Sequence, residues 1–229
     1  MTDTLQAIGR QLGNDVQALA SVSRNVANAQ TPGYRAERSV GDFAQQAGLR
    51  TRVDERDGSL QQTTRPLDLA LRGPGFFAAQ RGEQTVLVRG GAFRIDADGR
   101  LANAAGDVVL GASGPIAIDA RQITTATPLR VDADGQLWVG SQALDQLRIV
   151  AVAEPERLQA VGDGAYRYEG ALDDWRGSLV QGALESANVQ PADEMLRLME
   201  LTRHVESVRR AMSTYDQMLD TGINRIGEN

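Results

Sequence analysis

The chain has 229 residues, which is enough for one large domain or two small ones with a sizeable core. Its 24 basic and 30 acidic residues give a net charge of −6, and an acidic chain repels a phosphate backbone. The absence of cysteine excludes disulfides, thiolate metal sites and cysteine nucleophiles. We therefore expect no nucleic-acid partner and no thiolate-bound metal.

Every basic residue is an arginine, and the single histidine is His204. This composition excludes lysine Schiff bases, Walker-type phosphate loops and multi-histidine metal sites. The opening segment 1–6 has neither the basic start nor the apolar run of a secretory signal, and no stretch approaches about 18 apolar residues. We expect a soluble chain with no cofactor, no cleaved signal peptide and no membrane insertion.

Apolar residues at heptad-like spacing predict a helix near the N-terminus. These residues are Leu5, Ile8, Leu12, Leu19, Val22 and Val26. Asp15 takes one position of the pattern where an apolar residue is expected. The helix should end near Asn28 or Ala29, because Pro32 restricts the residue before it and Gly33 permits a turn.

The same spacing predicts a longer helix near the C-terminus. Its apolar positions are Leu198, Leu201, Val205, Val208, Met212, Tyr215, Leu219 and Ile226. Pro191 suits the first turn, and Asp193 and Glu194 place negative charge near the positive end of the helix dipole. From Asp193 to Ile226 such a helix would be roughly 50 Å long.

Between about Pro66 and Gly182 the apolar period changes to two, which predicts short β-strands. The segments 94–101 and 130–137 are near copies that each contain Asp-Ala-Asp-Gly. We interpret them as hairpins with type I′ turns. The stretch 31–64 has neither period, and we expect an extended linker there.

We tested these motifs as a calcium site, a phosphate-binding loop and a catalytic triad, and none has the required residues at the required positions. An EF-hand alignment of the Asp-Ala-Asp-Gly segments places Arg94 or Arg130 where the first carboxylate is needed. The loop 73–77 lacks the Lys and Ser/Thr of a phosphate-binding loop. His204 fits no Ser-His-Asp arrangement, and we interpret it as a surface or interface group. We predict no catalytic residue.

The heptad positions leave two interpretations open. An intramolecular helix pair, or a patch against the β-rich region, would bury them within one chain. Alternatively, the helices pair with those of neighbouring subunits and build a polymer, since a lone monomer would leave narrow apolar seams in water.

Three stretches carry a specific order of residues. Residues 22–35 read VSRNVANAQTPGYR, residues 65–77 read RPLDLALRGPGFF, and residues 187–191 read ANVQP, followed by Glu194 and Met195. Together they resemble the rod and hook proteins of the bacterial flagellum, and the resemblance spans essentially the whole chain. One departure is His204 after Arg203, where that family usually has an aromatic residue.

The resemblance implies a non-enzymatic structural subunit of the flagellar basal-body rod, most similar to a proximal rod protein. A distal rod or hook-type subunit is the alternative. It further implies helical polymerisation into a drive shaft around the export channel. Implied partners are other copies of the chain, neighbouring rod proteins and the flagellar export apparatus, in a rod that spans the periplasm. A monomeric β-rich surface-binding module is the rival from another class, and an enzyme is the third choice.

We therefore predict an α+β fold in which long N- and C-terminal helices form a coiled-coil-like assembly module, with an inserted β-rich domain of short antiparallel strands. The predicted parts are an assembly helix in 1–30, a linker in 31–64, a β-rich domain in 65–185 and an assembly helix in 186–229. The predicted assembly interface comprises Leu5, Ile8, Leu12, Leu19, Val22, Val26, Asn28, Pro32, Gly33, Leu198, Leu201, Val205, Val208, Met212, Tyr215 and Leu219.

Overall fold

The computed structural model describes the backbone of residues 2–41 and 49–227, and the side chains of residues 8–40, 51–214 and 217–218. The chain forms two compact units. The first contains helices α1 (Thr2–Ala27) and α2 (Pro191–Gly227), strand β1 (Glu37–Gly41) and the start of β2 (Leu49–Val53). The second contains segment Asn28–Ala36 and the later strands.

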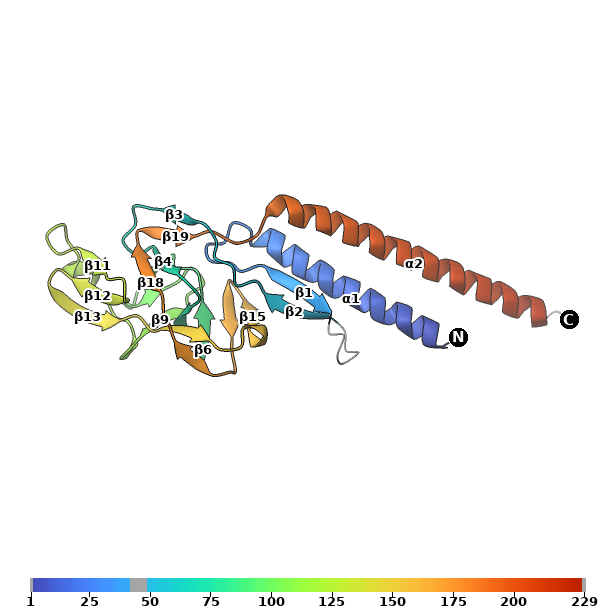
Figure 1. The fold of residues 1–229 in the computed structure, drawn as a ribbon, viewed down its shortest axis with the longest axis horizontal. Coiled ribbons are helices and arrows are strands. Elements are labelled where there is room, and N and C mark those ends of the chain that lie inside the picture. The colour runs from blue at the N-terminus through green and yellow to red at the C-terminus, as the bar shows by residue number, and fades with distance from the viewer. Residues whose placement is uncertain (1, 42–48, 228–229) are drawn as a thin grey trace. The chain divides into compact units, whose positions relative to one another are not determined.

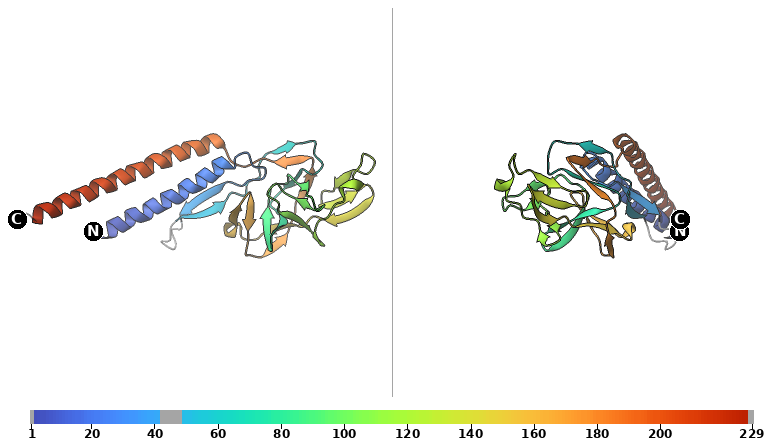
Figure 2. Two further views of the ribbon diagram at one scale, coloured as in Figure 1. Left: turned by 180° about the vertical axis from the view of Figure 1, so that it is seen from behind. Right: turned by 60° about the vertical axis from the view of Figure 1, so that its left-hand side comes forward.

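Helices α1 and α2 lie side by side in opposite directions (Figures 1 and 2). Helix α1 ends at Ala27, just before the end predicted from Pro32. Helix α2 begins at Pro191, whose missing N–H suits a first helical position. The Glu194 amide donates to the Gln190 carbonyl at 3.1 Å and closes the first turn. In the described part of the chain, neither helix is long and apolar enough to span a membrane.

The predicted fold class is wrong. The described residues contain two α-helices, one near each end, and most of the elements are β-strands; the helices do not form a coiled coil with an inserted β domain. One reason is that α1 packs against β1 as well as α2, so its buried surface is shared between a helix and a strand. Another is that the buried positions of α1 include Asp15, Ser21 and Asn25, whereas a coiled-coil seam is built from apolar side chains.

The largest sheet of the second unit has the strand order β15-β16-β6-β5-β9-β8-β7, with β10 paired to β9 and β14 paired to both β5 and β17. These pairings are antiparallel. The strands are β5 (Phe76–Arg81), β6 (Gln84–Val88), β7 (Arg94–Ile95), β8 (Leu101–Ala102), β9 (Val108–Gly111), β10 (Gly114–Pro115), β14 (Ile149–Val152), β15 (Gln159–Gly162), β16 (Ala165–Arg167) and β17 (Leu172–Asp174).

Smaller sheets join early and late segments of the second unit. Strand β4 (Leu69–Arg72) pairs with β18 (Ser178–Gln181), and β3 (Leu60–Gln62) pairs with β19 (Ala183–Glu185). A third small sheet has the order β11-β12-β13. Its strands are β11 (Leu129–Val131), β12 (Gln136–Val139) and β13 (Gln142–Gln146), and short 3-10 helices cover Ala120–Gln122 and Pro155–Arg157. The stretch 31–64 contains β1, β2 and β3.

Strand β5 buries side chains on both of its faces, as the period of two requires for a strand with core on each side. Phe77 belongs to the larger apolar cluster and packs edge-on against Phe93, with ring centroids 5.0 Å apart. Phe76, the preceding residue, belongs to a second cluster and packs against Tyr166 at 5.7 Å. The strand therefore separates two cores of the second unit.

The two Asp-Ala-Asp-Gly segments form the predicted hairpins, β7–β8 and β11–β12, but without type I′ turns. The Gly99 amide donates to the Asp96 carbonyl at 3.1 Å, and the Gly135 amide donates to the Asp132 carbonyl at 2.9 Å. In both turns, which are fully described, glycine alone has a positive φ, whereas a type I′ turn needs two consecutive positive values. The β15–β16 hairpin has that pair of values at Asp163-Gly164, 54° and 71°.

Candidate assembly site

Two polar contacts link α1 to α2, and they are separated by the same number of residues along each helix. The Asn25 Nδ2 group donates to Glu194 Oε2 at 3.1 Å, and His204 Nε2 lies 3.3 Å from Asp15 Oδ2. Ten residues separate Asp15 from Asn25, and ten separate Glu194 from His204. The two contacts therefore report one antiparallel register along this stretch of the helix pair.

Asn25 is fully buried and binds three backbone or side-chain groups at once. Its Nδ2 group donates to the Glu37 carbonyl at 2.9 Å, and its Oδ1 accepts from the Glu37 amide at 2.8 Å. The same Nδ2 group reaches Glu194 on α2. One side chain thus joins the end of α1, the start of β1 and the first turn of α2, and this explains why an asparagine stands there in the N-terminal motif.

Glu194 is the acceptor at which charged groups of the first unit converge. Its side chain is 1% exposed and pairs with Arg38 and, at 3.1 Å, with Arg197. Nearby, Arg24 pairs with the buried Glu37 at 2.6 Å. A carboxylate this deeply buried costs several kcal/mol in desolvation unless such partners offset it, so these pairs specify how α2 starts against β1.

The predicted interface residues of α1 and α2 are half-buried in the single chain, with the exception of Val22, which is buried. The half-buried residues are Ile8, Leu12, Leu19, Val26, Leu198, Leu201, Val205, Val208 and Met212. Leu5, Tyr215 and Leu219 lie outside the residues whose side chains are described. Each of these half-buried side chains therefore keeps part of its surface exposed in the single chain.

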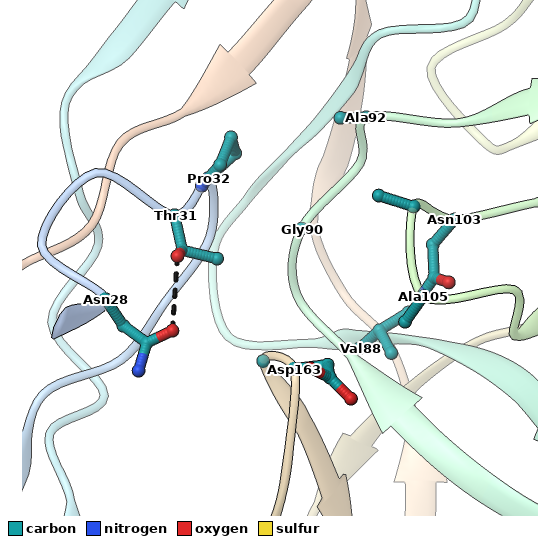
Figure 3. A pocket seen from close by; sticks show the side chains of 11 residues that line it. Asn28, Thr31, Pro32, Val88, Gly90, Ala92, Asn103, Ala105 and Asp163 are labelled. Carbon is teal, nitrogen blue, oxygen red and sulfur yellow. Dashed lines mark hydrogen bonds between the residues drawn. The ribbon is translucent and has the colours of Figure 1, made fainter. Parts of the chain in front are cut away.

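Asn28, Pro32 and Gly33 lie in the turn that follows α1 and belong to the second unit. The Thr31 amide donates to the Asn28 carbonyl at 2.9 Å, and the Thr31 hydroxyl donates to Asn28 Oδ1 at 3.2 Å (Figure 3). Gly33 has φ +70°, and a Cβ there would lie 2.4 Å from the Gly90 nitrogen. A Cβ on Gly90 would lie 2.5 Å from the Pro32 carbonyl oxygen. Glycines at both positions allow the two backbones to cross in contact.

A pocket of about 340 Å³ opens beside this crossing, between the 28–32 turn, the end of β6, the 103–105 loop and the β15–β16 hairpin tip (Figure 3). Its lining consists mainly of small and polar side chains, and Asp163 supplies the charge. The chain's single histidine is not among the lining residues. The pocket therefore offers hydrogen-bonding groups without a nucleophile paired to a histidine base.

A buried ion network lies next to this turn in the second unit. Arg89 is 0% exposed and pairs with Glu185 at 2.5 Å and with Asp57 at 3.2 Å. It also donates to the Gly73, Gly75 and Leu71 carbonyls at 2.6–3.0 Å. Arg35 pairs with Asp57 at 2.9 Å and with Glu185 at 3.1 Å, and it donates to the Glu55 and Arg56 carbonyls. Five distant segments meet at these two guanidinium groups.

The pKa values in and near this network shift in different directions. Burial, with the charge of Arg35, lowers the pKa of Arg89. Burial alone would raise the pKa of Asp57, but the hydrogen bond from Arg35 and the charges of Arg89 and Arg35 hold that pKa below its ordinary value. Burial raises the pKa of Glu55 against the opposing charges of Arg52 and Arg35. Asp57 thus stays ionised as the counter-charge between two arginines.

Five residues that hold these contacts were absent from the predicted interface: Asn25, Glu194, Arg35, Arg89 and Glu185. Asn25 and Arg35 lie in the N-terminal motif, and Glu194 follows the C-terminal one, so the motifs carried a signal for three of them. Arg89 and Glu185 had no such signal. They lie 96 residues apart, and only the fold brings Glu185, at the end of β19, beside Arg89, which follows β6.

The buried polar side chains described above bind other segments of the same chain rather than face a ligand. Among the described residues, no group of three or more His, Asp or Glu side chains is placed to hold a metal ion. These buried polar groups therefore hold segments of the chain together.

The chain belongs to the flagellar basal-body rod protein family. Residues 70–139 match the family model described as the flagellar hook protein FlgE/F/G D1 domain. Residues 180–226 match the model described as the C-terminal part of the flagellar basal body rod FlgEFG proteins. The resemblance predicted from the three sequence stretches is therefore confirmed.

Individual relatives are similar over nearly their full length. The flagellar basal-body rod protein FlgF of Mesorhizobium japonicum is 30% identical over 243 residues, with 99% of each chain covered. The FlgF protein of Escherichia coli is 30% identical over 224 residues, with 86% of this chain and 87% of the relative covered. The FlgG protein of Bacillus subtilis is 27% identical over 244 residues, with 89% and 91% covered.

Proposed function

We propose that the chain is a structural, non-enzymatic subunit of the rod in the bacterial flagellar basal body. The full-length similarity to rod proteins supports this proposal. So does the pairing of the chain's two end helices by Asn25–Glu194 and Asp15–His204, which builds one module from opposite ends of the sequence. The function of such a subunit is mechanical, since a rod transmits torque through its stiffness.

We further propose that segments 1–30 and 186–229 carry the contacts by which subunits polymerise helically around the export channel. The half-burial of the seam residues supports this step, because their remaining exposed area is available to a neighbour. Complete burial of a Val, Leu or Ile side chain is worth about 1.5–3 kcal/mol, and repetition over many subunits would make the shaft rigid.

The partners in this proposal are other copies of the chain, neighbouring rod proteins and the flagellar export apparatus. The location is the rod that crosses the periplasm, reached through flagellar export without a cleaved signal peptide. No cofactor has a role in it. The proximal rod is the assigned position, with the distal rod as the alternative.

Replacing Val208 by aspartate tests the proposal. Val208 is half-buried on α2, and a carboxylate there would be desolvated without a partner. The variant is expected to be absent from basal bodies purified from cells that lack the wild-type chain, and those cells should be non-motile. Val208→Ala is the matched control and should retain partial incorporation. Basal bodies that contain the aspartate variant at the wild-type level would contradict the proposal.

A further inference from the structure

The sequence contains four Asp-Gly dipeptides, and the fold holds them in different ways. They are Asp57-Gly58, Asp98-Gly99, Asp134-Gly135 and Asp163-Gly164. In such a pair the glycine amide nitrogen can attack the side-chain carboxyl carbon of the aspartate, because glycine has no side chain to obstruct the approach. The attack requires that the amide and the carboxyl group are both free to turn toward each other.

In three of the dipeptides the glycine amide is bound to another group. The Gly99 and Gly135 amides close the turns of the β7–β8 and β11–β12 hairpins. The Gly58 amide donates to the buried Glu185 side chain at 2.9 Å, and the carboxyl group of Asp57 belongs to the buried ion network. Each of these three nitrogens must therefore lose a hydrogen bond before it can attack.

The fourth dipeptide, at the tip of the β15–β16 hairpin, is not held in this way. Within the described part of the chain, the Gly164 amide donates to no other group. The Asp163 side chain is 70% exposed, and its Oδ2 lies 3.8 Å from Nη2 of Arg81, which is too far for a hydrogen bond. Arg81 itself is held by the buried Asp107 at 2.6 Å. Both reacting groups of this dipeptide are therefore free to turn.

The backbone at Asp163 is also in a less favoured conformation. Among the described residues, Asp163 alone has a positive φ without being glycine, and the angle is 54°. Residues with a side chain are rarely found there, although aspartate and asparagine adopt this region more readily than most. Strain of this kind lowers the cost of leaving the native conformation, which the attack requires.

We propose that Asp163 is the position at which the folded chain converts aspartate to isoaspartate. The Gly164 nitrogen forms a bond to Asp163 Cγ, the C–OH bond of the protonated carboxyl group breaks, and the hydroxyl leaves with the amide proton as water. Water then adds to the resulting succinimide ring. Opening at Cγ restores aspartate, whereas opening at the main-chain carbonyl gives isoaspartate. Water is the only co-reactant, and nothing is oxidised or reduced.

The product alters one wall of the pocket beside the 28–32 turn. Asp163 and Gly164 both line this pocket of about 340 Å³ (Figure 3). In isoaspartate the main chain runs through the former side chain, so the turn gains one backbone carbon and the carboxylate moves to the α-carbon. The charge of the pocket is kept, but its position and the shape of the turn change. This inference goes beyond the proposed function, because it concerns a single folded chain.

Trypsin separates the four dipeptides for the test. Cleavage after Arg157 and Arg167 releases residues 158–167, LQAVGDGAYR, in which Asp163 is the sole acidic residue. The full-length protein is incubated at neutral pH in the folded state and, in parallel, unfolded in concentrated urea. Liquid chromatography with mass spectrometry then separates the aspartate and isoaspartate forms of each peptide, which have the same mass, and electron-transfer fragmentation assigns them.

Two asparagine variants provide a faster matched comparison. Asp163→Asn and Asp98→Asn form the same ring at their positions, with ammonia released in place of water. The Asp98 side chain is 71% exposed, nearly the same as the 70% of Asp163. The glycine amide after Asp98 is hydrogen-bonded, whereas the one after Asp163 is not. The pair of variants therefore compares a bound with an unbound amide at equal exposure.

In the folded chain, Asp163 is expected to convert about tenfold faster than each of the other three aspartates, because their glycine amides must first lose a hydrogen bond. Asp163→Asn should likewise convert about tenfold faster than Asp98→Asn. In urea the four aspartates should convert at similar rates, since the fold no longer distinguishes them.

Equal rates at the four aspartates in the folded chain, or faster conversion at one of the other three, would overturn the inference. Absence of isoaspartate at Asp163 in the folded chain would overturn it as well. A folded Asp98→Asn that converts as fast as Asp163→Asn would show that the hydrogen bond to the amide does not protect, which also overturns it. None of these outcomes bears on the proposed function.

Discussion

The side chain of His204 meets that of Asp15 across the helix pair, with Nε2 3.3 Å from Oδ2. Asp15 stands where the heptad pattern of α1 calls for an apolar residue, and its side chain is 8% exposed. His204 stands where the resemblance to rod and hook proteins implies an aromatic residue. The two departures from pattern are thus neighbours across the helix pair, and the imidazole gives the buried carboxylate a polar neighbour at 3.3 Å.

Loss of His204 should weaken the helix pair. In His204→Ala, Asp15 loses its polar neighbour on α2 and keeps the hydrogen bond from Gln11, which is 2.9 Å long. Because His204 is 54% exposed, the expected loss is about 1 kcal/mol in the free energy of unfolding. Urea titration followed by circular dichroism at 222 nm measures it.

The double variant Asp15→Leu/His204→Leu is the control for this prediction. Replacing a buried polar pair by apolar residues is often neutral or stabilising, so the double variant should be at least as stable as the wild type. A double variant less stable than His204→Ala would contradict this prediction. It would mean that Asp15 and His204 stabilise the fold through contacts with other residues rather than with each other.

Alanine at Gly33 should destabilise the second unit. The added Cβ would lie 2.4 Å from the Gly90 nitrogen, and φ is +70°, where residues with a side chain are strained. We expect a loss of at least about 2 kcal/mol, measured by thermal unfolding.

Gly13→Ala gives the matched comparison inside α1. Nothing lies within 4 Å of a Cβ built at Gly13, and the residue is in the interior of a helix. Alanine there should stabilise the chain by about 0.5–1 kcal/mol. If both alanine variants shifted stability in the same direction, the close approach at Gly33 would not explain its identity.

Lysine cannot replace Arg89. The guanidinium serves two carboxylates and three carbonyls from a fully buried position, and an ammonium has neither its planar fork nor its five donors. Arg89→Lys should lower the free energy of unfolding by about 3 kcal/mol, since it leaves buried groups unpaired. Arg94→Lys, at an exposed position, should change it by less than about 0.5 kcal/mol. Equal effects at both positions would refute this role of the network.

Acid should weaken the same network through Asp57. A carboxyl group whose pKa is lowered by folding stabilises the fold above its unfolded pKa of about 3.9. That contribution is lost as the pH falls through the lower folded pKa. Asp57→Asn should therefore be less stable than the wild type at pH 7, and the gap should narrow between pH 4 and pH 2. A gap that stays constant over this range would show that Asp57 does not contribute through its charge.

Local patterns determined the parts of this protein that depend on neighbours in sequence. Heptad spacing predicted both helices, and Pro32 with Gly33 predicted where α1 ends, because helix formation and termination are decided within a turn or two. Period-two alternation predicted strands in the middle of the chain for the same reason. Ordered motifs at residues 22–35, 65–77 and 187–191 predicted the family.

Tertiary structure decided what those elements contact. Heptad spacing cannot distinguish a coiled coil from a helix that shares its buried surface with a strand, and the β1 contact on α1 made the coiled-coil prediction wrong. The structure brings Asp15 close to His204 and Arg89 close to Glu185, although each pair is far apart in the sequence. Local helix and strand propensities cannot predict such long-range contacts. Burial and long-range partners arise from the fold as a whole, whereas helix and strand periods are already present in each short segment of sequence.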